Sequence, residues 1–68
     1  MTIGQKIRAL REQSGMTQKD LAKMLSISAQ AISKWENGVN YPDISVLPQI
    51  ADGFGISMDE LFDYKKKS

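Results

Sequence analysis

The sequence predicts an all-α protein, a compact bundle of five helices. Three segments share one pattern. An apolar residue comes directly before a Ser or Thr, and a second apolar residue comes four positions after that Ser or Thr. The hydroxyl can cap the free amides of a first helical turn, and the two apolar side chains fix the angle at which the chain enters the helix. The three capping residues are Thr17, Ser28 and Ser57. No strand pattern competes with this interpretation.

The first helix is expected to run from Thr2, with Gln5 at the capping-box position, to Gly15, a residue suited to a left-handed cap. Its apolar residues are spaced three or four positions apart, which gives one buried stripe along the helix. They are Ile3, Ile7 and Leu10.

The second helix is expected from Thr17 to about Leu25 and the third from Ser28 to about Asn37, with Gly38 ending it. Only residues 26–27 connect these two helices, so they must cross steeply instead of lying antiparallel. The side chains expected to be buried here are Leu21, Ala22, Leu25, Ile32 and Trp35.

Residues 38–45 form the longest irregular stretch. Pro48 is tolerated only in a first turn, so the fourth helix is expected to start at about Ser45 and to end near residues 53–55. The fifth is expected from Ser57 to about Tyr64. The side chains predicted to be buried in these two helices are Leu47, Ile50, Ala51, Phe54, Leu61 and Phe62.

Length and composition narrow the possible functions. Sixty-eight residues allow one domain, expected over 1–64, with a frayed basic tail over 65–68. Cysteine and histidine are absent, which excludes a disulfide, a thiol nucleophile, a Cys/His zinc site and an imidazole base. No cofactor or metal is expected. No apolar run approaches the roughly 20 residues of a membrane span, so a cytoplasmic protein is expected.

Charge is divided along the chain. Residues 1–34 carry six Lys or Arg against two acidic residues, whereas residues 35–64 carry six acidic residues and no Lys or Arg. Residues 65–67 are all lysine. This division predicts a cationic end that meets a polyanion and an anionic end directed away from it, although scattered solvated charges remain the alternative.

Two short helices joined by a tight turn match the helix-turn-helix geometry, in which the second helix enters the major groove of DNA. Ile32 and Trp35 must face the core, which leaves four residues near the start of the third helix pointing outward: Ala29, Gln30, Ser33 and Lys34. Gln can bond to adenine, Lys to guanine, Ser to either, and Ala can touch a thymine methyl group. No carboxylate precedes Glu36 on this helix, as a DNA-reading surface requires.

Residues 16–22 (Met-Thr-Gln-Lys-Asp-Leu-Ala) and 27–38 (Ile-Ser-Ala-Gln-Ala-Ile-Ser-Lys-Trp-Glu-Asn-Gly) closely resemble the Cro and phage-repressor type of helix-turn-helix family, the lambda-repressor-like fold. Residues 42–51 and 55–61 resemble its fourth and fifth helices, so the resemblance covers roughly residues 3–62. The resemblance implies a five-helix DNA-binding domain, with the helix-turn-helix at about 17–37, that usually acts as a dimeric repressor.

The resemblance also implies roles for individual residues. Those expected to contact DNA phosphates are Gln18, Ser28, Asn37 and Asn40, and Ser28 also falls among the recognition positions. Arg11 and Glu36 fall where some phage repressors bury an ion pair that ties the first helix to the third. Ser26 departs from the pattern, because glycine usually holds this turn position and a left-handed Ser is strained by about 1 kcal/mol.

These observations predict a DNA-binding transcriptional regulator, most simply a homodimeric repressor of a roughly palindromic operator, associated with the nucleoid and not with a membrane. Two copies would meet half-sites about 34–36 Å apart, and the acidic carboxyl-terminal third is expected to carry their interface. The alternative is a protein-interaction or antitoxin-type module with the same fold. An enzyme is not expected, because no nucleophile and base are paired. The chain could also be the amino-terminal module of a longer regulator.

Overall fold

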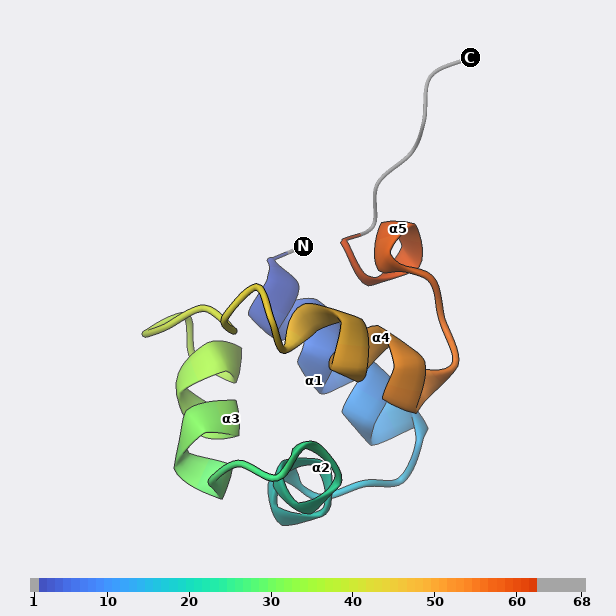
Figure 1. Cartoon of the computed structure of the whole chain (residues 1–68). Helices are drawn as coiled ribbons and strands as arrows, with labels where there is room; N and C mark the ends of the chain where they lie inside the picture. The colour runs from blue at the N-terminus through green and yellow to red at the C-terminus, as the bar shows by residue number, and fades with distance from the viewer. Residues whose placement is uncertain (1, 63–68) are drawn as a thin grey trace.

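The computed structural model describes residues 2–62, and in this part of the chain it contains five helices and no strand. They are α1 (Ile3–Gln13), α2 (Gln18–Leu25), α3 (Ala29–Glu36), α4 (Leu47–Phe54) and α5 (Met58–Leu61). In Figure 1, α1 runs through the middle of the molecule behind α4, with α3 on one side and α2 at one end. The predicted all-α fold is confirmed, while the predicted tail 65–68 lies outside the described residues.

Hydroxyl side chains cap the start of four helices, as predicted. Each accepts a hydrogen bond, 3.0–3.2 Å long, from the backbone N–H three residues further on. At three of these starts the side chain of that later residue also accepts from the backbone N–H of the cap, which completes a capping box. The capping residues are Thr2, Thr17, Ser28 and Ser57. Local sequence therefore sets where these helices begin.

The predicted start of the fourth helix is wrong by two residues. Ser45 does not begin a helix, because its backbone N–H and its hydroxyl both donate to the carboxylate of Asp43. These bonds hold residues 44–46 in a turn, and α4 begins at Leu47 with Pro48 in its first turn. Hydrogen bonds from Ser45 also hold the pKa of the Asp43 carboxyl below its ordinary value.

Phe62 was predicted to be buried, and this prediction is wrong: 48% of the residue is exposed. Helix α5 is only four residues long, and its one fully buried position is Leu61. Since neighbouring helical residues point about 100° apart, Phe62 cannot share that buried direction. Leu47 and Phe54 are half-buried and pack against the core instead of lying within it. The predicted end of this helix at Tyr64 lies outside the described residues.

Each helix contributes one fully buried side chain to a common core. These five residues have no exposed surface: Ile7, Leu21, Ile32, Ile50 and Leu61. Trp35 joins them at 7% exposure, on the same inward side of α3 as Ile32. No helix can leave the bundle without exposing a core residue. Helix α3 packs chiefly against α1 and α2, so its position is coupled most directly to these two helices. No helix within residues 2–62 is long and apolar enough to span a membrane.

The backbones of α1 and α3 come unusually close at Gly4. A Cβ atom added there would lie 1.9 Å from the carbonyl oxygen of Trp35 and 2.8 Å from its carbonyl carbon. Both are backbone atoms, which cannot swing aside as a side chain can. Gly4 therefore lets the first turn of α1 press against the end of α3.

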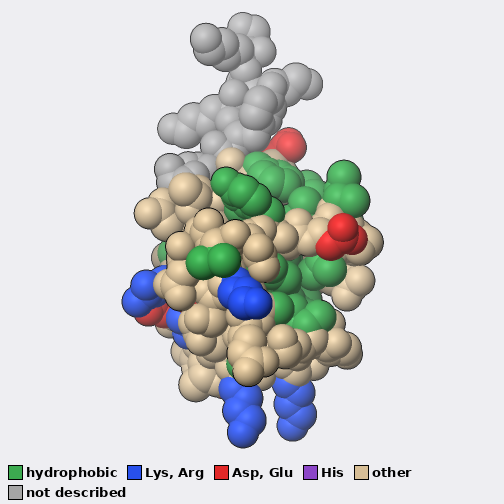
Figure 2. Space-filling model, turned by 90° about the vertical axis from the view of Figure 1, so that its left-hand side faces the viewer, with side chains coloured by type: hydrophobic (Ala, Val, Ile, Leu, Met, Phe, Trp, Pro, Cys, Tyr) green, Lys and Arg blue, Asp and Glu red, His purple; other side chains and the backbone are tan. Residues whose placement is uncertain are grey.

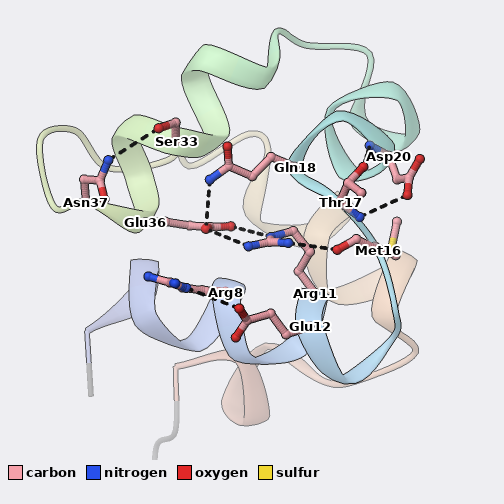
Figure 3. Close-up of polar contacts among 10 residues, drawn as sticks. All are labelled: Arg8, Arg11, Glu12, Met16, Thr17, Gln18, Asp20, Ser33, Glu36 and Asn37. Carbon is pink, nitrogen blue, oxygen red and sulfur yellow. Dashed lines mark hydrogen bonds and ion pairs between the residues drawn. The ribbon is translucent and has the colours of Figure 1, made fainter.

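A buried ion pair joins the same two helices (Figure 3). Arg11 Nε donates to Glu36 Oε2 at 2.8 Å, and Arg11 Nη2 donates to Glu36 Oε1 at 3.1 Å. The exposed fractions of the two side chains are 11% for Arg11 and 2% for Glu36. Gln18 Nε2 also donates to Glu36 Oε1 at 3.1 Å, and Arg11 Nη1 donates to the carbonyl oxygen of Met16 at 2.8 Å. One carboxylate thus ties α3 to α1 and to the start of α2.

These contacts shift the pKa values of both partners. Burial alone raises the pKa of the Glu36 carboxyl, but the hydrogen bonds from Arg11 and Gln18 and the charge of Arg11 outweigh burial and hold it below its ordinary value of 4.5. The hydrogen bond to Glu36 raises the pKa of Arg11. Both groups are therefore charged in the folded protein near neutral pH.

We predict that alanine at Gly4 destabilises the fold by about 3 kcal/mol or more, since the new methyl group overlaps the backbone of α3. Gly53→Ala is the matched control. Its Cβ would meet only the flexible end of Met24, at 2.4 Å, so that side chain can move and the free energy of unfolding should change by less than about 1 kcal/mol. Urea unfolding of both variants measures the difference. Equal losses would contradict the close approach of α1 and α3.

We also predict that Glu36 makes the stability depend on acid pH. Because the folded-state pKa is depressed, the ionised carboxylate stabilises the fold above the unfolded-state pKa, and this stability is lost as pH falls through the lower folded-state value. Glu36→Gln should be less stable than the parent near neutral pH. Below about pH 4.5 its free energy of unfolding should fall less steeply.

Urea unfolding between about pH 3 and pH 7 gives both slopes. Asp20 and Asp43 also have lowered pKa values, owing to hydrogen bonds from Thr17 and Ser45, and they contribute equally to both proteins. The difference between the two curves therefore reports Glu36. Parallel curves throughout would show that the ion pair adds no acid-dependent stability.

Candidate nucleic-acid interface

Helices α2 and α3 form the predicted helix-turn-helix. Figure 1 looks almost along α2 while α3 lies in the plane of the view, so the two cross steeply, as the short connection predicts. Ser26 is the C-cap of α2, with φ 58° and ψ 41°, and it is the one non-glycine residue with positive φ among residues 2–62. The turn therefore tolerates the strain of a left-handed serine, whereas the helix ends at Gly15, Gly38 and Gly55 use glycine.

The outward side of α3 carries the residues predicted to read bases. Gln30 and Lys34 are exposed, and Ser33 is half-buried. Ala29 is also half-buried and packs against the core, so it offers less surface than the other three. The one carboxylate of α3, Glu36, is turned inward to Arg11. The exposed side of this helix therefore presents amide, hydroxyl and ammonium groups and no negative charge.

Figure 2 views the molecule from the side that α3 occupies. Cationic side chains project from its lower end and others lie at its middle and along one edge, while the Asp and Glu side chains in view lie towards its edges. Lys19, Lys23 and Lys34 are all exposed. Arg8 forms a surface ion pair with Glu12 at 3.5 Å, and both side chains are 57% exposed, so the pair adds little stability. The face around α3 is electropositive.

The residues predicted to contact phosphates lie at helix ends and in the following loop. Gln18 is the first residue of α2 and is half-buried, because its amide donates to Glu36. The hydroxyl of Ser28 is occupied in capping α3, where it accepts from Ala31 N. Asn37 is the C-cap of α3, and its Nδ2 donates to Ser33 Oγ at 3.4 Å. Asn40 is exposed in the next loop. The exposed side chains of Asn37 and Asn40 therefore remain available for phosphate contacts at the end of α3 and in the loop after it.

Two features of this region were not predicted from the sequence. The bond from Gln18 to Glu36 links residues eighteen positions apart, and no local spacing reports it. The sequence does contain a signal for the role of Gly4. A glycine within a helix lowers helix stability by about 1 kcal/mol relative to alanine, so its presence there indicates a packing reason. Within residues 2–62 there is no pocket, and no group of three or more acidic, His or Cys residues that could hold a metal ion.

Comparisons with known proteins agree with this geometry. A family model described as helix-turn-helix matches residues 7–61. The chain is 41% identical over 61 residues to the HTH-type transcriptional activator BcrR of Enterococcus faecalis, covering 90% of this chain but only 30% of that protein. It is 40% identical over 58 residues to the uncharacterized HTH-type transcriptional regulator YazB of Bacillus subtilis, covering 85% of this chain and 84% of that protein.

A solved structure has the same fold. The P22 c2 repressor protein in complex with synthetic operator 9T superimposes with a TM-score of 0.85 at 31% identity, covering 96% of this chain and 98% of that one. These relatives are regulators of transcription and not enzymes, in agreement with the sequence prediction. The family model matches residues 7–61, and the likeness to YazB covers 84% of that protein. The chain therefore belongs to the helix-turn-helix family of the Cro and phage-repressor type.

Proposed function

We propose that the chain binds double-stranded DNA by inserting α3 into the major groove, and that it thereby regulates transcription as a dimeric repressor. The proposal rests on which charged side chains of α3 are buried and which are exposed. Its single carboxylate is buried against Arg11, so the exposed side keeps only Gln30, Ser33 and Lys34. The P22 c2 repressor, which shares the fold, has been solved in complex with a synthetic operator, and this supports DNA as the ligand.

In this mechanism phosphate contacts supply most of the affinity and α3 supplies the sequence preference. We assign phosphate contacts to Gln18, Ser28, Asn37 and Asn40. We assign the base edges and the groove to Ala29, Gln30, Ser33 and Lys34. Each good bidentate contact to a base contributes about 1–3 kcal/mol of discrimination. A regulator of this kind would act in the cytoplasm, on the nucleoid.

The direct test is selection of bound duplexes from a random pool. We expect Gln30→Ala combined with Lys34→Ala to broaden the selected sequences, because the two side chains that reach furthest into the groove are gone. Both are exposed, so the fold should stay intact, as unfolding and circular dichroism would confirm. The control is Lys23→Ala on α2, which should weaken binding to all sequences and reduce its salt dependence while leaving the preference unchanged.

An unchanged selection profile for the double variant would refute the assignment of the reading face. Failure of the parent chain to shift a random duplex even at low salt would refute DNA binding itself, and would favour the protein-interaction module.

We further propose that two copies bind a roughly palindromic operator, because an eight-residue helix reads too few base pairs for a unique site. The loop between α3 and α4 offers a contact surface. Its side chains Val39, Tyr41 and Ile44 are 67%, 76% and 79% exposed. The loop is anchored by the buried Pro42 and by the bonds of Ser45 to Asp43, so these side chains are held outward.

Residues 41–62 contain no Lys or Arg, so this part of the surface has no positive charge to draw it towards phosphates and stays available to a second copy. We expect Tyr41→Ser combined with Ile44→Ser to retain binding to a single half-site. The parent should bind a duplex with two half-sites about tenfold or more tightly than a duplex with one, and the same variant should lose this difference.

Binding to duplexes with one and two half-sites, taken from the selected sequence, measures this advantage. Phe62→Ser is the comparison variant, since it removes an exposed apolar side chain from the acidic carboxyl-terminal third, where the sequence alone predicted the interface. If the loop carries the contact instead, this variant should leave the ratio of the two affinities unchanged. A full-site advantage that survives the loop variant would place the contact elsewhere.

A further inference from the structure

The peptide Asn37–Gly38 lies at the carboxyl end of the proposed reading helix. Asn37 is the C-cap of α3, and Gly38 follows with φ +76°. Both residues are exposed, and nothing lies within 4 Å of the position that a Cβ on Gly38 would occupy. An asparagine side chain followed by glycine is open to attack by the next backbone nitrogen, because no side chain on that next residue hinders the approach.

We propose that Asn37 is a site of spontaneous deamidation that weakens DNA binding by this chain. Hydroxide removes the proton of the Gly38 amide, and the nitrogen attacks Cγ of the Asn37 carboxamide. The new C–N bond closes a succinimide ring, the bond from Cγ to Nδ2 breaks, and ammonia leaves with a proton taken from water. Water then opens the ring at either carbonyl to give aspartate or isoaspartate. The net reaction consumes one water and releases one ammonia, without oxidation or reduction.

The contacts around Asn37 set the rate of this reaction. The Gly38 N–H is bonded to the carbonyl oxygen of Trp35 at 3.2 Å, so the end of α3 must open before the nitrogen can attack. Bonds at a helix end are among the first to open. The carboxamide itself is held only by an exposed, 3.4 Å bond to Ser33 Oγ. Val39 N and Asn40 N also donate to the carbonyl oxygen of Lys34, so the rate of conversion is limited by the opening of this helix end.

The effect on DNA rests on the proposed function. Deamidation replaces a donor amide with a carboxylate where a phosphate is expected, so attraction becomes repulsion. The new negative charge also lies at the carboxyl end of α3, the end that the helix dipole already makes negative. Affinity should fall about tenfold for all sequences alike, because a phosphate contact carries no sequence information.

The chain contains its own comparison site. It has two asparagines, and Asn40 is also exposed but is followed by Tyr41, whose side chain hinders attack. The experiment incubates the 68-residue chain at mildly alkaline pH, with and without its selected duplex. Peptide mapping by mass spectrometry follows Asn37 and Asn40 separately, and duplex binding is measured on the same samples.

We expect Asn37 to convert well before Asn40, the loss of affinity to follow the converted fraction, and bound duplex to slow the conversion. Asn37→Gln, which keeps a carboxamide but would require a less favourable larger ring, should hold its affinity on ageing. Asn37→Asp should begin at the affinity of aged protein, and Asn40→Gln should age like the parent.

Equal conversion of the two asparagines, or none at Asn37, would overturn the assignment of the site. Full conversion with unchanged affinity would overturn its effect on binding. Both outcomes are distinct from failure of the proposed function, which would appear as fresh, unconverted protein that does not bind duplex.

Discussion

The attachment of α3 to α1 is the constraint on which the rest of the structure depends. It has two parts, the close backbone approach at Gly4 and the ion pair between Arg11 and Glu36. A carboxylate that is 2% exposed is stable only while its donors stay in place, so Glu36 cannot move without a large loss of free energy. Because Gln18 donates to the same carboxylate, the start of α2 is fixed with it.

This attachment also gives α3 its chemistry. Burying Glu36 withdraws the only negative charge of the helix, and one interaction therefore both positions α3 and leaves its outer side suited to DNA. The acidic residues that follow, from Asp43 onward, lie in and beyond the loop after α3. The exposed lysines of α2 and α3 (Lys19, Lys23 and Lys34) thus precede a stretch, residues 41–62, that carries acidic residues and no Lys or Arg.

Much of the fold could be predicted from the sequence, because its signals are local. Hydroxyl caps at Thr17, Ser28 and Ser57 act within one turn, so they place the helix starts correctly. The start of α4 was misplaced because Ser45 bonds to Asp43, a competing local interaction. Phe62 was misplaced because apolar character alone does not give the direction of a residue just past a helix end.

Contacts distant in sequence were harder to predict. The pairing of Arg11 with Glu36 was expected only through resemblance to a family, and the contribution of Gln18 to it was not expected at all. The close approach at Gly4 depends on the packing of two complete helices, which no short window of residues reports. The proposed reading face is intermediate, since its outward residues follow from helix periodicity but the DNA sequence that they would prefer does not.

The buried ion pair holds α3 in position. A double-mutant cycle of Arg11→Met and Glu36→Leu, followed by urea unfolding in a stabilising osmolyte that keeps the weaker variants folded, tests it most directly. Each single variant should lose about 3–5 kcal/mol, because it leaves the other charge buried alone, and the double variant should regain most of that loss. Losses that simply add would show that the two side chains do not act as a pair.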